Sequence, residues 1–310
     1  MNKTIFIILS LLLILNCSAP QTKRSVTTTS IINLQVIATI GPDITGSRPL
    51  NSPRSIAVNH SGEIYIADFG NDRVVKLDSS YNLIKEVGGF GSGEYALKGP
   101  IDLALDKVSN LYVADFGNKR IVRLDRHLNF SGAEEGFTRD KVTEFIRPVS
   151  VELSNRGEVL VGDEGLGACY KLDQFFSYIF EFGGRDEIFS VIYPSDICYD
   201  NGDIYVTDPE YGYIFTYDDF GMFTGKIGED IIQSPSAIAV SPGVGLWVTD
   251  KNSGTLHLLN YRGKELFRWN GYGEYRLYRP EDVFVDDNDK IYLVDSQTSR
   301  IYVLRPLAGN

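Results

Sequence analysis

The chain has 310 residues, of which 43% are hydrophobic and 12% aromatic, enough apolar material for a large core, and this argues against a disordered protein. Its 30 Lys and Arg against 41 Asp and Glu give a formal net charge of -11, which repels phosphate backbones and argues against nucleic acid as a partner. The length would allow two average domains, but one all-β propeller also uses this length.

The first 16 residues have the pattern of a secretory signal peptide. A weakly basic start is followed by an almost wholly apolar run over residues 5–15, which is too short to span a bilayer comfortably. The motif Ile-Leu-Asn-Cys at residues 14–17 resembles the lipobox of bacterial lipoproteins, although Asn16 stands where that family usually has Gly, Ala or Ser. The resemblance implies that Cys17 is diacylated and becomes the new N-terminus, with cleavage elsewhere as the alternative.

Residues 17–33 are rich in Ser and Thr and lack an apolar period, so we expect a flexible tether. Together with a lipidated Cys17, this tether predicts an extracytoplasmic protein anchored to a bacterial membrane, either the outer membrane or the periplasmic side. The membrane is then one partner of the chain, through its lipid anchor.

A repeat begins at residue 53 and organises the rest of the chain. Residues 53–78 read as strand, turn, strand, loop and strand, with an alternating Ile-Tyr-Ile-Ala run closed by Asp68. The pattern recurs five more times at steps of 41 to 48 residues, a period typical of propeller blades. The repeats open at Pro53, Pro100, Pro148, Pro194, Pro235 and Pro280, and their second strands close at Asp68, Asp115, Asp163, Asp208, Asp250 and Asp295.

A fourth strand follows most repeats. It is expected at residues 83–87, 178–182, 223–227 and 265–269, and its signal is weakest in the second repeat, at residues 129–137. The last repeat ends at Leu304 with no room for such a strand, whereas residues 34–40 match the fourth-strand pattern. We therefore predict that the N-terminal strand completes the sixth blade and closes the ring. The propeller then spans residues 34–305, and residues 306–310 form a C-terminal tail.

The repeats resemble the NHL repeat family. The resemblance rests on Pro-x-x-Ile-Ala-Val, on Ile-Tyr-x-Ala-Asp-x-Gly-Asn-x-Arg-Val and on the Gly-rich run at residues 88–93, and it is strongest in the first two repeats, at Asn71, Arg73, Asn118 and Arg120. It implies an all-β, six-bladed β-propeller with four-stranded blades. It implies function much less firmly, because this fold hosts lyases, lactonases, RNA binders, sensor domains and scaffolds.

Two cysteines remain in the repeats, at unlike positions of consecutive units. Cys169 stands where the first repeat has Val74, and Cys198 stands where it has Ala57. This favours two small apolar groups that fill core space, with a disulfide between them as the alternative.

The three histidines do not predict a metal site. Enzymes of similar six-bladed architecture include a lyase that holds zinc with three histidines, but here His60, His127 and His257 fall at unlike blade positions. No zinc site is therefore expected. Neither a Ser-His-Asp constellation nor a phosphate-binding loop is convincing, since the Gly-rich run lacks a following helix N-terminus.

Three aspartates alternate by blade in the innermost strands. Asp102, Asp196 and Asp282 belong to repeats 2, 4 and 6, and repeats 1, 3 and 5 have Ser or Ala at the same position. The carboxylates would approach one mouth of the axial channel from three directions, an arrangement that suits calcium. The alternative is that each Asp hydrogen-bonds its neighbouring loop, and no cofactor is then required.

Glu152 is a second unusual residue of the channel, because its mid-strand position holds Ala, Cys or Phe in the other repeats. A carboxylate there must face channel water or find a partner. As a catalytic acid it would need a raised pKa.

The loops between second and third strands lie on the face that propellers commonly use for binding. They diverge from the repeat pattern in blades 3 to 5, at residues 164–167, 209–213 and 251–253. Tyr211 and Tyr213 are candidate contact residues, because amphipathic aromatics in loops often form contact patches. The alternative is that these two rings pack between blades.

These features predict a monomeric, lipid-tethered extracytoplasmic propeller that binds a protein, peptide or glycan on its loop face without catalysis. The alternative function is a lactonase-like hydrolase or lyase that uses a divalent metal on Asp102, Asp196 and Asp282. RNA binding is a third hypothesis, which the acidic charge opposes.

Overall fold

The computed structural model describes residues 31–41, 43, 48–138, 142–184, 191 and 193–308. The expected signal peptide, Cys17 and most of the tether lie outside these residues. Within the described ranges, no helix has the length and apolar character needed to cross a membrane.

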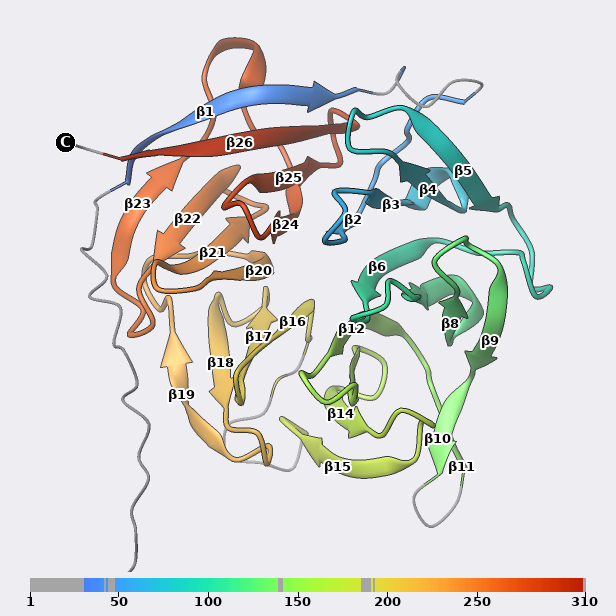
Figure 1. The fold of residues 1–310 in the computed structure, drawn as a ribbon. Coiled ribbons are helices and arrows are strands. Elements are labelled where there is room, and N and C mark those ends of the chain that lie inside the picture. The colour runs from blue at the N-terminus through green and yellow to red at the C-terminus, as the bar shows by residue number, and fades with distance from the viewer. Residues whose placement is uncertain are drawn as a thin grey trace, which may run out of the picture.

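Six four-stranded antiparallel sheets surround a central axis and form the expected six-bladed β-propeller (Figure 1). The first blade contains β2 (Ser55–Val58), β3 (Ile64–Asp68), β4 (Arg73–Leu77) and β5 (Leu83–Gly88), and the second contains β6 (Pro100–Leu105), β7 (Leu111–Asp115), β8 (Arg120–Leu124) and β9 (Phe130–Glu134). The third contains β12 (Pro148–Leu153), β13 (Val159–Asp163), β14 (Ala168–Leu172) and β15 (Tyr178–Phe182). The fourth contains β16 (Asp196–Asp200), β17 (Asp203–Asp208), β18 (Tyr213–Tyr217) and β19 (Phe223–Ile227), and the fifth contains β20 (Pro235–Ser241), β21 (Gly245–Asp250), β22 (Thr255–Leu259) and β23 (Glu265–Trp269).

The sixth blade joins the two ends of the chain, as predicted. It contains β24 (Pro280–Val285), β25 (Ile291–Asp295), β26 (Arg300–Ala308) and, as its outermost strand, β1 (Ile31–Ile40). β1 runs antiparallel to β26 in Figure 1, with Val36 opposite Leu304 and Ile40 opposite Ile301. The pairing starts three residues before the expected residue 34 and includes residues 306–308, which were expected to form a tail. The longer strands leave less of the β26 edge unpaired.

The core lies between the blades. The middle strand β3 is buried at all five positions, and its Ile66 packs in one cluster with Val294 and Ile301 of the sixth blade. The next cluster joins Ala57 of the first blade to Leu103 of the second. Each blade therefore buries its apolar faces against its neighbours.

The polar residues of the repeat motif hold its loops. Asp68 accepts hydrogen bonds from the Arg73 Nε at 2.7 Å and from the Asn71 Nδ2 at 2.8 Å through one oxygen, and from the backbone N–H of Asn51 at 2.7 Å through the other. Asp115 and Arg120 repeat the buried ion pair at 2.8 Å in the second blade. This residue pattern therefore fixes the backbone of the loops.

Two details of the blades were not fixed by the repeat pattern. The weak fourth strand of the second blade is formed by β9, and a hairpin of β10 (Gly136–Thr138) and β11 (Val142–Glu144) follows it before the third blade.

Cys169 in β14 and Cys198 in β16 are free thiols. Cys169 is fully buried in an apolar cluster and Cys198 packs against another, in agreement with the core-filling interpretation.

Candidate functional site

The first strands of the blades surround the axial channel. Each contacts the first strands of both neighbouring blades around the ring: β2, β6, β12, β16, β20 and β24. A cavity of about 540 Å³ opens where these strands begin, and a second of about 390 Å³ opens where they end. Asp102, Asp196 and Asp282 line both cavities, so the three carboxylates lie in the channel between its two mouths.

Each of these carboxylates joins two blades. One oxygen of Asp102 accepts the backbone N–H of Val151, in the next blade, at 2.8 Å. Its other oxygen accepts the N–H of Leu103 at 2.8 Å and the hydroxyl of Ser55, in the preceding blade, at 3.0 Å. Asp102 therefore links the first three blades at the channel wall.

The other two aspartates repeat this arrangement. Asp196 accepts the N–H of Ile238 at 2.8 Å, and Asp282 accepts the N–H of Ile56 at 2.7 Å. The partner is thus the first strand of the following blade, rather than the neighbouring loop that the sequence suggested. A buried N–H without an acceptor is costly, so these carboxylates stabilise the ring.

The hydrogen bonds of the three aspartates also concern the calcium hypothesis, because they involve the oxygens that would bind the ion. Both oxygens of each carboxylate already accept a backbone N–H, one from its own strand and one from the next blade. Among the residues that the structure describes, no three His, Cys, Asp or Glu side chains are grouped to hold a metal ion. Backbone donors already engage these oxygens and would compete with a metal ion for them, and calcium binding by the three aspartates stays a prediction.

The channel favours the protonated form of its acids. Burial raises the pKa of Asp282 to about 7, and the Asp102 carboxylate adds to this shift. Burial also raises the pKa of Asp102, and it raises that of Asp196 well above its usual range, with the other two carboxylates contributing to the shift of Asp196. The hydrogen bonds from backbone N–H groups oppose these shifts.

Glu152 lies in the channel on the side away from the larger cavity. It lines the smaller cavity and accepts the N–H of Leu153 at 2.8 Å. Burial raises its pKa to about 8, with smaller contributions from Asp102 and Asp282. Glu152 is therefore a protonated channel residue near neutral pH, separate from the loops that we expected to bind.

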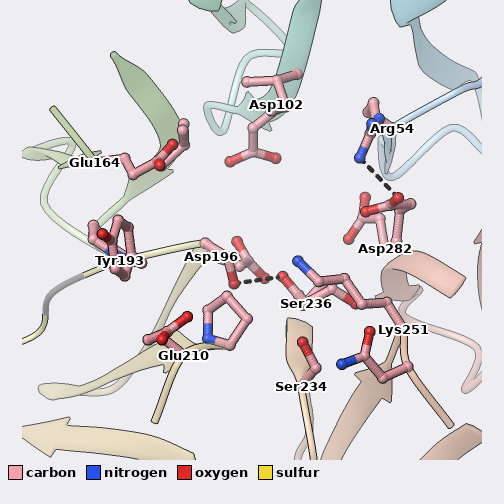
Figure 2. Close-up of a pocket in the computed structure, with 18 residues that line it drawn as sticks. Arg54, Asp102, Glu164, Tyr193, Asp196, Glu210, Ser234, Ser236, Lys251 and Asp282 are labelled. Carbon is pink, nitrogen blue, oxygen red and sulfur yellow. Dashed lines mark hydrogen bonds and ion pairs between the residues drawn. The ribbon is translucent and has the colours of Figure 1, made fainter. Parts of the chain in front are cut away.

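The larger cavity, which we call the loop-face cavity, is bounded by the loops that diverge from the repeat pattern. Glu164, Glu210 and Lys251 belong to the loops between second and third strands of blades 3, 4 and 5. Arg54 and Tyr193 come from the segments that lead into first strands. Figure 2 shows Glu164, Tyr193 and Glu210 on one side of the opening, and Arg54 and Lys251 on the other.

The aspartates that close the second strands position this rim. Asp208 accepts the backbone N–H groups of Tyr193 at 3.1 Å and Glu210 at 2.9 Å. Asp250 accepts those of Ser234 at 3.2 Å and Asn252 at 3.1 Å, and the Lys251 N–H donates to the Ser234 carbonyl at 3.1 Å. The backbone that carries the rim side chains is thus fixed by the repeat itself.

The charged groups of the rim differ in how they are paired. The Arg54 guanidinium contacts Glu281 at 2.7 Å, and Arg279 contacts the same carboxylate at 2.6 Å. In the described part of the chain, the Lys251 ammonium and the Glu210 carboxylate have no hydrogen-bond or ion-pair partner. Burial lowers the pKa of Lys251, and the Glu281 and Glu164 carboxylates oppose this shift.

Tyr211 and Tyr213 line neither cavity. Their rings stack on each other with centroids 5.4 Å apart, and Tyr213 continues to Phe215 at 5.1 Å along β18. Tyr211 is 41% exposed. The pair is therefore the outer end of an aromatic row within the fourth blade, and a contact role for Tyr211 and Tyr213 stays a prediction.

The loops of Glu164, Glu210 and Lys251 stand out in the sequence, but these three side chains do not, and neither do Arg54 and Tyr193. Divergence from the repeat marked the three loops. Arg54 and Tyr193 stand beside the Pro residues that open their repeats. The residue type at these positions varies among the repeats, so no sequence pattern distinguishes the two residues.

Comparisons with known proteins agree with this fold. The sequence profile of the NHL repeat matches residues 50–77, which confirms the resemblance in the first blade. A search of curated proteins gave no match.

Solved propeller structures match most of the chain at low sequence identity. A streptogramin B lyase has 12% identity and a TM-score of 0.63, and the match covers 90% of this chain and 99% of that one. A gluconolactonase from Xanthomonas campestris has 12% identity and a TM-score of 0.65, over 94% and 96% of the two chains. An auxiliary nutrient binding protein from Bacteroides thetaiotaomicron has 12% identity and a TM-score of 0.63, over 82% and 68%. These similarities establish the fold only, since enzymes and a binding protein share it.

Proposed function

We propose that this propeller is a non-catalytic binding protein that holds part of a protein, peptide or glycan in the loop-face cavity. The observation that carries the proposal is the cavity of about 540 Å³, lined by charged and hydroxyl side chains from several blades. Its volume falls in the range of about 300–1,000 Å³ that is usual for ligand pockets.

The fixed backbone of the rim supports binding. Asp208 and Asp250 hold the segments that carry Glu210 and Lys251 through several N–H bonds each. A rim that is ordered before the ligand arrives loses less conformational entropy on binding. The cavity is therefore suited to recognise a polar ligand by direct contacts.

Binding is favoured over hydrolysis or elimination because the aspartates of the channel are engaged in hydrogen bonds that join the blades. Asp102, Asp196 and Asp282 are occupied by backbone N–H groups of two blades each, an arrangement that serves the ring. His60 and His127 are exposed outside the loop-face cavity, and His257 is buried in β22 beside Glu265. A general acid or base must lie within hydrogen-bond reach of the reacting group, and no histidine meets this condition in the loop-face cavity.

Equilibrium dialysis against peptide and oligosaccharide libraries tests the proposal. Asn252 is exposed at the rim and its side chain makes no hydrogen bond in the described structure, so Asn252→Trp would fill the opening without disturbing the fold. We expect the wild-type chain to retain compounds that the variant does not, and to return them chemically unchanged. Equal retention by both proteins would place binding elsewhere, and recovery of cleaved or rearranged compounds would contradict a non-catalytic role.

We propose further that Cys17 anchors this monomer to a bacterial membrane on the extracytoplasmic side. The support is the apolar run of residues 5–15, the lipobox-like residues 14–17 and the polar stretch that leads to β1. Labelling of cells with a fatty-acid probe should mark the wild-type chain and leave Cys17→Ser unmarked. Equal labelling of the two would refute the anchor while leaving the binding proposal untouched.

A further inference from the structure

The loop-face cavity has separated charges of opposite sign. Glu164 and Glu210 lie on one side of the opening in Figure 2, and the Lys251 side chain extends from the other side toward its middle. Glu164 has one partner, Arg147 at 3.3 Å, whereas Glu210 has none among the described residues. Among the described residues, Lys251 has no partner and faces Glu210, which has none, and Glu164, which has one, across a space large enough for a ligand.

Arg54, the second cationic residue of the rim, does not change this separation of charge. Arg54 is held by Glu281 at 2.7 Å and lies over the Phe69 ring, with its guanidinium carbon 5.0 Å from the ring centroid. Glu281 also accepts a hydrogen bond from Ser296 at 3.1 Å. This network is satisfied within the protein, which leaves Lys251 as the cationic group with unused hydrogen-bonding capacity.

On the basis of the binding function proposed above, we propose that the ligand is a zwitterion, a short peptide with free termini, whose carboxylate contacts Lys251 and whose ammonium contacts Glu210 and Glu164. A carboxylate and an ammonium each form strong charge-assisted hydrogen bonds with a group of opposite sign. The partial burial of Lys251 makes such a bond more favourable than at a fully exposed surface.

The rest of the cavity disfavours ligands of a single sign. Its rim carries the carboxylates Glu164, Glu210 and Glu281 against the cations Arg54 and Lys251, so a simple anion meets more acidic than basic groups there. A simple cation leaves the Lys251 ammonium unpaired in a partly desolvated place, which costs free energy. A zwitterion in one orientation satisfies both sides, and this requirement gives specificity as well as affinity.

The direct test uses equimolar mixtures of random tripeptides in three forms: free termini, acetylated N-terminus and amidated C-terminus. Retention of each mixture by the protein is measured by equilibrium dialysis with mass spectrometry. Either cap should lower retention by about tenfold or more, because one charged contact is lost. A mixture of free amino acids forms a fourth arm. Retention of the tripeptides but not the amino acids indicates a peptide, and the reverse result indicates a single amino acid.

Two variants assign the contacts. In Lys251→Met the acid and amide forms should bind equally. In Glu210→Gln the preference for the free over the acetylated form should shrink, because only Glu164 remains to contact the ammonium. Lys264→Met is the matched control, since Lys264 is exposed in the turn at the far end of the fifth blade. It should behave as the wild-type chain does.

The outcomes separate this inference from the proposed function. The zwitterion proposal would be overturned if acetylation and amidation of the tripeptides did not change their retention. It would also be overturned if the protein retained neither free tripeptides nor free amino acids. If a neutral oligosaccharide were then retained by the wild-type chain and lost in Asn252→Trp, the cavity would still be the binding site. If no compound distinguished the wild-type chain from Asn252→Trp, the binding function itself would fall.

Discussion

An oxygen of Asp282 accepts the backbone N–H of Ile56 at 2.7 Å, a contact between residues 226 positions apart that joins the sixth blade to the first. The ring is therefore closed twice, by this bond at the channel and by the pairing of β1 with β26 at the outer edge. Asp102 and Asp196 make the equivalent bonds between the second and third blades and between the fourth and fifth. The alternation of aspartates in the sequence thus places a carboxylate that accepts an N–H from the following blade in every second blade.

Asp282→Asn should lower the free energy of unfolding by about 1–3 kcal/mol, because the amide keeps one acceptor oxygen and leaves one of two buried N–H groups unsatisfied. Urea denaturation of the variant at pH 8 measures this change. Asp203→Asn, at an exposed position, is the control and should change little. Equal stability of wild-type and Asp282→Asn proteins would mean that the carboxylate does not join the blades.

Deletion of residues 31–41 should prevent soluble folding, because the deletion exposes the β26 edge and removes the fully buried Leu34 and Ile40 from two core clusters. Size-exclusion chromatography and circular dichroism of the purified chain measure the result. Deletion of residues 2–30 is the control and should leave the propeller folded. A monomeric, cooperatively unfolding chain without residues 31–41 would refute closure by β1.

The stability of the protein should fall as pH rises from about 4.5 to about 8. In this range folded Glu152, with its pKa raised to about 8 by burial, keeps a proton that the unfolded chain has lost at its usual value of 4.5. The folded state then binds more protons, so this group decreases the free energy of unfolding by at most about 1.4 kcal/mol per pH unit. Glu152→Gln should show a shallower slope and exceed the wild-type stability at pH 9. Parallel pH profiles of the two proteins would contradict the raised pKa.

Calcium should leave the melting temperature unchanged, since the carboxylate oxygens of Asp102, Asp196 and Asp282 already accept backbone hydrogen bonds. Differential scanning calorimetry with millimolar calcium chloride and with a chelator makes the comparison. A calcium-dependent rise that disappears in Asp196→Asn would revive the metal hypothesis and the lactonase-like alternative.

The sequence predicted the blades well, because each blade repeats one local pattern. Pro53, Asp68 and Arg73 have equivalents one period away, so strand order and ring closure followed from alignment of the repeats. The hairpin of β10 and β11 was missed, since it lies between two repeats and has no equivalent in the others.

The site was predicted only in part, because its contacts cross between blades. The alternation of Asp102, Asp196 and Asp282 was visible, but their partners Val151, Ile238 and Ile56 become neighbours only in the closed ring. Tyr211 lies in the turn before β18, and the loop sequence alone did not show that its ring stacks on Tyr213 and contacts Phe215. Contacts between blades also decide whether a charged loop residue has an ion-pair partner. The sequence therefore did not show that Arg54 is paired with Glu281 whereas Lys251 has no partner among the described residues.

Chemical protection of Lys251 is the measurement that tests binding in the loop-face cavity most directly. The protein is acetylated with a limiting amount of reagent, with and without a compound that the wild-type chain retains in dialysis, and the acetylation of each lysine is measured by mass spectrometry. We predict that a saturating compound slows the modification of Lys251 by about tenfold or more while exposed Lys264 reacts at an unchanged rate. Equal modification of Lys251 with and without the compound at saturation would contradict a binding site in this cavity.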